Sequence, residues 1–151
     1  MQRTYRKEGF TLAELIIVIA LLAILFGIFV AVINPAKQFA RARNTRRKAD
    51  INSILTAVKE NMVNNNGTFV CSSGPLPTST PTNIGTSTGS YDLSPCIVPD
   101  FLPHIPVDPQ FGVFRSDTDY DSQYNIIQDD KGRVTVSAPH AEDGATISET
   151  R

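Results

Sequence analysis

The sequence has few residues of the kinds that build active sites. Only two histidines and two cysteines occur among 151 residues, and neither His104 nor His140 stands at a recognisable ligand spacing from the other or from a cysteine. The Gly-rich phosphate loop, the G-x-S-x-G elbow and the H-E-x-x-H zinc motif are missing. We therefore predict isolated surface or packed histidines in a protein that is not an enzyme and has no small-molecule substrate.

Polar residues are nearly lacking between positions 10 and 33. Over these 24 residues the only clearly polar side chains are Thr11 and Glu14. As a helix this run would span about 36 Å, enough for the roughly 30 Å hydrocarbon core of a membrane. A secretory signal has a shorter apolar region, about 7–15 residues, followed by a small-residue cleavage site. Asn34 and Pro35 follow here instead, so we predict a retained single-pass anchor.

The charges that are present are segregated along the chain. Residues 1–8 carry a net charge of +2 and residues 37–50 a net charge of +5, whereas residues 51–151 carry −7. The acidic C-terminal part argues against an extended nucleic-acid-binding face there. Three interpretations remain for the basic cluster within 37–50: contact with solvent or lipid headgroups, with acidic patches of neighbouring subunits, or with DNA. The cluster consists of Arg41, Arg43, Arg46, Arg47 and Lys48.

The residues at the junction between the basic start and the apolar run follow a specific order. Residues 6–15 read Arg-Lys-Glu-Gly-Phe-Thr-Leu-Ala-Glu-Leu. This segment resembles the class III prepilin leader and mature start of type IV pilins and type II secretion pseudopilins. The resemblance implies that a membrane prepilin peptidase cuts between Gly9 and Phe10, that the new amine of Phe10 is methylated, and that Glu14 aligns subunits during assembly. It also implies identical or related pilin subunits and an inner-membrane assembly platform as partners.

Glu14 needs a physical explanation of its own. A carboxylate deep in a membrane costs at least ~2.5 kcal/mol, less near the interface, and usually has a partner. Nearby residues offer none once the leader is removed, whereas a free α-amino group at Phe10, from the same or a neighbouring subunit, would supply a positive charge. Alternatively, Glu14 lies at the membrane surface as a helix-start carboxylate that the helix dipole favours.

Two signals disagree on the orientation in the membrane. The basic excess after the apolar run exceeds the excess before it, which would place residues 37–50 in the cytoplasm. The prepilin resemblance implies the reverse, because the cleavage site must face the cytoplasm. We follow the resemblance and expect an inner-membrane single-pass protein with its leader in the cytoplasm and its head outside, in a periplasmic or extracellular filament after assembly.

Beyond residue 34 the pattern becomes amphipathic and predicts the second half of one long helix. Pro35 should kink or locally loosen this helix without necessarily ending it, and residues 64–67, Asn-Asn-Asn-Gly, supply a stop. One face carries apolar residues at three- and four-residue spacings. They are Phe39, Ala42, Ile51, Ile54, Leu55, Val58 and Met62.

Short strands are predicted near the C-terminus. Residues 111–115, 123–128 and 133–138 have strand-like composition, with a hairpin turn at 129–132. The expected fold class is α+β: a long N-terminal helix, membrane anchor plus amphipathic half, packed on a small antiparallel sheet as in pilins. The expected parts are a leader over 1–9, a transmembrane half over 10–34, an amphipathic half over 35–66 and a globular head over 67–151.

Residues 72–95 are rich in Ser, Thr, Pro and Gly and predict an exposed loop. Cys71 and Cys96 flank this loop. In an exported protein they are expected to form a disulfide that stabilises by about 3 kcal/mol, whereas in a reducing compartment they would remain free thiols.

Two further motifs lie in the head. Asp117, Asp119 and Asp121 alternate as calcium ligands do. Ser122 in place of Gly at position 6 and Gln128 in place of Glu at position 12 argue against an EF-hand. Two interpretations are left: a looser calcium site of the three aspartates, with or without Asp108, and a solvated acidic loop. Residues 106–109, Pro-Val-Asp-Pro, are similar to a turn of the major secretion pseudopilin, although the aromatic residue and asparagine expected after it are missing.

Overall fold

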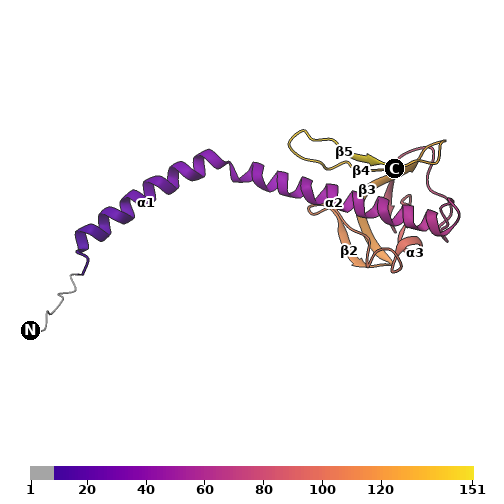
Figure 1. Cartoon of the computed structure of the whole chain (residues 1–151), viewed down its shortest axis with the longest axis horizontal. Helices are drawn as coiled ribbons and strands as arrows, with labels where there is room; N and C mark the ends of the chain where they lie inside the picture. Colours follow the sequence, from indigo (N-terminus) through magenta and orange to yellow (C-terminus); the bar gives the residue numbers. More distant parts are fainter. Residues whose placement is uncertain (1–8) are drawn as a thin grey trace, which may run out of the picture. The chain divides into compact units, whose positions relative to one another are not determined.

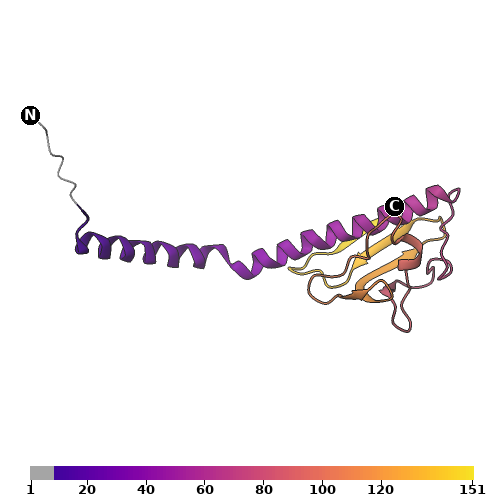
Figure 2. The same cartoon turned by 90° about the horizontal axis from the view of Figure 1, so that it is seen from below.

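The computed structural model of the chain describes residues 9–151 (Figures 1 and 2). The basic residues of the predicted leader, Arg6 and Lys7 among them, lie outside the described residues. The chain divides into a first compact unit that ends at Gln38 and a second over Phe39–Arg151, which we call the head. Each unit is described by itself.

The long N-terminal helix consists of α1 (Leu12–Ile33) and α2 (Pro35–Asn64), with an interruption at the residue before Pro35, where a disturbance of the helix was predicted. Asn34 between them adopts a left-handed conformation, with φ 46° and ψ 79°. Proline disfavours a helical conformation in the residue before it, and asparagine tolerates the left-handed region better than most residues. The carbonyl oxygen of Asn34 then accepts a hydrogen bond from the backbone N–H of Lys37 at 3.1 Å, which starts α2.

The predicted stop at residues 64–67 is confirmed. Helix α2 ends at Asn64, and Asn66 and Gly67 follow with positive φ angles of 56° and 87°. The N–H of Gly67 donates back to the carbonyl of Met62 at 2.8 Å, which closes the last helical turn as a left-handed C-terminal cap does.

A five-stranded antiparallel sheet forms the other layer of the head. The three predicted strands are confirmed, and the hairpin turn at 129–132 joins two of them, with the N–H of Asp129 bonded to the carbonyl of Arg133 at 2.9 Å. The strand order is β1-β3-β4-β5, and β2 also pairs with β3. The bounds are β1 Thr82–Gly85, β2 Val113–Ser116, β3 Asp119–Gln128, β4 Val134–Ala138 and β5 Ile147–Thr150.

The core lies between α2 and this sheet, which run side by side in the head (Figure 2). The predicted apolar stripe is buried from Ile51 onward, and Met62 packs against its edge. Toward the start of α2 the apolar residues of this face are not buried, and Phe39 is 64% exposed. The buried positions there are Asn44 and Arg47, which are polar.

The Ser/Thr/Pro-rich segment 72–95 is only partly a loop. It contains β1 and the start of the short helix α3 (Ser94–Ile97), and Leu76, Ile84 and Leu93 from this segment are buried in the core. The local composition did not predict β1, because this strand is only four residues long and depends on pairing with β3, about forty residues further along the chain. The expectation of a wholly exposed loop was therefore wrong.

Candidate functional site: the processing and assembly segment

The predicted cleavage site lies immediately before α1. Gly9 and Phe10 are outside any helix or strand, and the side chain of Phe10 is 94% exposed. A Cβ atom added at Gly9 would meet nothing within 4 Å. Within residues 9–151, neither side of the predicted scissile bond is covered by other parts of the chain.

Thr11 and Glu14 form a reciprocal cap at the start of α1. The Glu14 carboxylate accepts hydrogen bonds from the backbone N–H and the hydroxyl of Thr11, both at 2.9 Å, while the Thr11 hydroxyl accepts from the N–H of Glu14 at 3.2 Å. This capping box satisfies backbone donors that a helix start otherwise leaves without partners. The sequence contains its signal, Thr-x-x-Glu before an apolar run, but the prediction that Glu14 lacks a nearby partner overlooked it.

Helix α1 presents apolar side chains to its surroundings. The stretch Leu12–Val30 is long and apolar enough to cross a membrane, and none of it is buried within the described structure. Glu14 is its one charged residue. At 1.5 Å per residue the 22-residue helix is about 33 Å long, close to the thickness of a hydrocarbon core. So much exposed apolar surface requires lipid or other apolar helices around it.

The basic cluster on α2 is not simply a surface feature. Arg47 is fully buried and binds Asp108, also fully buried, through two hydrogen bonds of 2.7 and 3.2 Å. Its remaining terminal nitrogen donates to Glu142 at 2.8 Å and to the Asn44 side chain at 2.9 Å. Arg43 binds the same Glu142 carboxylate at 2.6 and 2.7 Å. None of the three predicted interpretations describes these two arginines, which are bound within their own chain.

These ion pairs fasten distant parts of the head to α2. Hydrogen bonds from Arg43, and then from Arg47, lower the pKa of Glu142 to about 2. Burial acts to raise the pKa of Asp108, but hydrogen bonds from Arg47 and from the N–H groups of Gln110 and Phe111 outweigh it and hold that pKa below its usual value.

No local pattern in the sequence indicates the Arg47–Asp108 pair, because 61 positions separate the two residues. The similarity of residues 106–109 to a pseudopilin turn nevertheless drew attention to Asp108. Because Gly112 packs so closely that an added Cβ would lie 2.5 Å from the Asp108 nitrogen, the turn is tightly closed.

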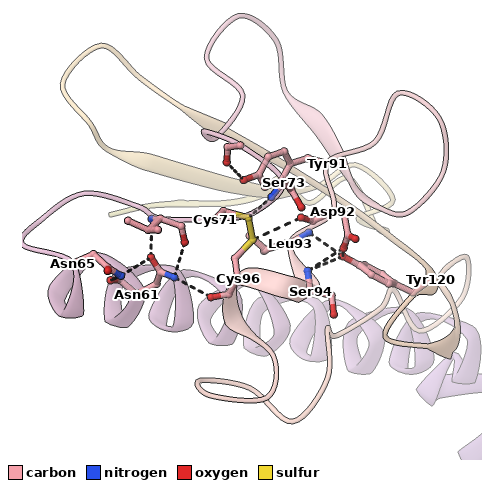
Figure 3. Close-up of a disulfide and its surroundings, with 12 residues drawn as sticks. Asn61, Asn65, Cys71, Ser73, Tyr91, Asp92, Leu93, Ser94, Cys96 and Tyr120 are labelled. Atoms are coloured by element: carbon pink, nitrogen blue, oxygen red, sulfur yellow. Dashed lines mark hydrogen bonds between the residues drawn. A yellow bond between two sulfur atoms is a disulfide. The ribbon is translucent and has the colours of Figure 1, made fainter.

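Cys71 and Cys96 form a disulfide, as predicted for an exported head. Asn61 of α2 lies beside it and binds both ends of the closed segment: its amide donates to the carbonyls of Val70 and Cys96 at 3.0 and 2.9 Å (Figure 3). On the other side of the bridge, the Tyr120 hydroxyl accepts from the N–H of Leu93 at 3.0 Å. The bridge and these hydrogen bonds together hold α2, α3 and β3 near one another.

Replacing both cysteines by serine should lower the free energy of unfolding of the head by about 3–4 kcal/mol, because the open chain regains the entropy that a 25-residue separation removes. The melting temperature should fall by roughly 10–20 °C. Circular dichroism of the full chain in detergent measures both quantities, and the wild-type chain under reducing conditions is the matched control. Equal melting of oxidised and reduced wild-type chain would contradict this prediction.

The predicted calcium ligands are not gathered at one point. Asp108 is occupied by Arg47, Asp119 binds Arg115 at 3.2 Å, and Asp121 accepts from Asn83 at 2.9 Å. Within residues 9–151 no group of three or more acidic, histidine or cysteine side chains is placed to hold a metal ion. The geometry lends the calcium site no support, and calcium binding stays an untested prediction.

Both histidines contact aromatic rings. The His104 ring lies 5.4 Å from the Phe114 ring and the His140 ring 4.5 Å from the Phe111 ring, measured between centroids. The Nε2 atom of His140 also lies 3.0 Å from the side-chain oxygen of Gln123. These are packing contacts at the edge of the head.

Comparison with known proteins agrees with the N-terminal geometry. The family model of the prokaryotic N-terminal methylation motif matches residues 5–30, which include the cleavage site, the capping box and most of α1. Searches of curated proteins and of solved structures give no match. The chain thus combines this N-terminal motif with a long apolar helix and an α+β head, the arrangement that the resemblance to pilins predicts. More particularly, the chain carries a class III prepilin leader, the type found in type IV pilins and pseudopilins.

Proposed function

We propose that this chain is the precursor of a structural subunit of a type IV pilus-like filament. Prepilin peptidase cuts it between Gly9 and Phe10, the new amine of Phe10 is methylated, and an inner-membrane platform assembles it with other pilin subunits. The leader faces the cytoplasm and the head lies outside. The observation that carries this proposal is the methylation motif running without a break into an exposed apolar helix that precedes a folded head.

The geometry of the capping box supports an assembly role for Glu14. Its carboxylate faces the N-terminal end of α1, because the N–H of Thr11 lies 2.9 Å from it. Cleavage would create an α-ammonium group one residue earlier, at Phe10. This cation, on the same or a neighbouring subunit, balances the carboxylate where apolar helices pack together and little water remains.

A second candidate within the same class is a type II secretion pseudopilin, which forms a short fibre. The similarity of residues 106–109 to the pseudopilin turn favours it, and Asp108 has a structural role in this turn as the buried partner of Arg47. Both candidates share the processing step, so the first experiment serves both. A single-pass protein that displays a small binding domain without being cut is the competing outcome.

Co-expression with a prepilin peptidase should yield a chain that begins at Phe10 and is heavier by one methyl group, as measured by mass spectrometry of the intact protein. A Gly9→Val variant should remain largely uncut. Because a Cβ at Gly9 meets nothing within 4 Å, the substitution leaves the fold intact and changes only what the peptidase encounters. A wild-type chain that still begins at Met1 would refute the processing and favour the uncut single-pass protein.

A further inference from the structure

An open, mostly apolar pocket of about 380 Å³ lies between the C-terminal half of α2 and the turn that joins β3 to β4. Leu55, Val58 and Met62 of α2 and Val134 of β4 contribute to its walls. Val63, next to these residues on α2, is 69% exposed. Leu55, Val58 and Val134 are themselves buried, so the apolar surface that the pocket offers to a ligand comes from Val63 and the partly buried Met62.

The charged residues around this pocket are all cations. Residues 51–151 contain five basic and twelve acidic residues, yet the pocket is lined by four of the five basic ones and by none of the acidic ones. We call it the cationic pocket. Its cations are Lys59, Lys131, Arg133 and Arg151.

Most of this positive charge is not neutralised within the chain. Arg133 pairs with Asp129 at 2.7 Å. Among the residues that the structure describes, the Arg151 side chain donates to two neutral side-chain oxygens, those of Thr56 and Asn52, at 3.0 and 2.8 Å. Over residues 9–151 no ion pair joins Lys59 or Lys131 to a carboxylate. A ligand for the cationic pocket must therefore combine apolar groups with negative charge.

The same head carries a surface of that composition. Residues 113–121 form β2, its turn and the start of β3, and we call them the acidic hairpin; they hold three aspartates against one arginine. Val113 and Phe114 are 42% and 41% exposed, and all four residues of β2 lie at the surface. Asp117, at the turn, is exposed as well.

The two surfaces lie at opposite ends of one strand. The acidic hairpin meets β3 at Asp119, and the turn that borders the cationic pocket leaves it after Gln128. Ten residues of extended chain separate these points by about 30 Å. Because the two surfaces are far apart, the acidic hairpin cannot reach the cationic pocket of its own head. When the hairpin of one copy binds the pocket of a second copy, the pocket of the first and the hairpin of the second remain open for further copies.

We propose that the acidic hairpin of one copy docks in the cationic pocket of the next. Val113 and Phe114 supply the apolar contact, and Asp117 and Asp119 face Lys59 and Lys131. This inference rests on the proposed function, because a filament subunit must contact its neighbours, and it specifies which surfaces of the head meet. A repeated contact of this kind generates a helical row, as unclosed head-to-tail interfaces do.

Photo-crosslinking of the full chain in its membrane or filament tests this contact. With Phe114 replaced by p-benzoylphenylalanine, light should produce dimers whose linked peptides contain residues 55–63 or 131–134 of a second copy. Lys131→Glu should lower the dimer yield by about threefold to tenfold, the range expected for an exposed ion pair that becomes repulsive. Adding Asp117→Lys to this variant should restore the yield. Lys48→Glu, an exposed position on α2 that does not line the cationic pocket, is the control.

The proposal would be overturned by a yield of crosslinked dimers that Lys131→Glu leaves unchanged, or by linked peptides from other parts of the chain. A monomeric chain in which a bound lipid-like anion protects Lys59 and Lys131 from amine labelling would overturn it as well. The N-terminal mass of the same samples separates this result from the proposed function. A chain that begins at Phe10 and forms filaments without the crosslink refutes only the contact, and a crosslink in an uncut chain refutes only the processing.

Discussion

Replacing Arg47 by methionine should lower the free energy of unfolding of the head by about 3–5 kcal/mol. The substitution keeps much of the side-chain volume but leaves Asp108 as a buried carboxylate without its cation. Asp108 retains the N–H groups of Gln110 and Phe111, at 2.9 and 3.0 Å, and Glu142 retains Arg43, so part of the network survives. Chemical unfolding of the full chain in detergent, followed by the near-ultraviolet circular dichroism of its tyrosines, measures the change.

Arg46→Met is the matched control for this substitution. The Arg46 side chain is 65% exposed and lies 3.9 Å from Asp50, so its removal should change stability by at most about 0.5 kcal/mol. A double variant with Arg47→Met and Asp108→Asn should recover part of the loss, because asparagine keeps an oxygen for the two turn N–H groups but carries no charge. Equal stability of the Arg46 and Arg47 variants would contradict the structural role of the buried pair.

The pH dependence separates a lost ion pair from a simple packing defect. The pKa of Asp108 lies below its usual value in the folded chain, so its pairing stabilises the head above about pH 4 and is lost as the pH falls through the lower, folded pKa. In the Arg47→Met variant no cation counteracts the effect of burial on Asp108, so the pKa of Asp108 should rise. The deficit relative to the wild-type chain should therefore begin to shrink as the pH falls through this raised pKa, and shrink further as the pH falls through the lowered pKa of the wild-type chain, whereas a packing defect would persist.

The sequence predicted the features that arise from local patterns. The apolar run, the stripe from Ile51 to Met62, the stop after Asn64 and the hairpin turn at 129–132 all depend on residues within a few positions of one another, and all are confirmed. The interruption of the long helix before Pro35 has a local cause as well. Proline constrains the residue before it, and Asn34 accepts the left-handed conformation that interrupts the helix.

The features that the sequence did not reveal depend on contacts between distant residues. Strand β1 exists because Ile84 packs in the core and its neighbours pair with β3, although its own composition is typical of a loop. Arg47 appeared to be one of several surface cations, and only the fold places Asp108 and Glu142 against it. At the candidate site, by contrast, the sequence predicted the motif that contains the cleavage site and Glu14. It did not lead us to Thr11 as the partner of Glu14, although the local pattern Thr-x-x-Glu indicates that pairing.

Removing the charge of Glu14 should abolish filaments while leaving the chain in the membrane. Both Glu14→Ala and Glu14→Gln should insert normally, because each makes α1 more apolar, and both should reduce sheared filaments by more than about tenfold. That factor corresponds to the loss of one desolvated ion pair of roughly 1.4 kcal/mol or more per contact. Immunoblots of membrane and filament fractions measure the two quantities separately.

The glutamine variant decides between the two roles that the structure allows for Glu14. Glutamine can still accept the hydrogen bonds of Thr11 in a capping box, but it cannot pair with the ammonium group of Phe10. If the charge aligns subunits, Glu14→Gln should fail as completely as Glu14→Ala, and Thr11→Val, which removes the hydroxyl but keeps the carboxylate, should assemble at near wild-type levels. If Glu14→Gln forms normal filaments and Thr11→Val does not, Glu14 serves as a helix cap and the registration role is refuted.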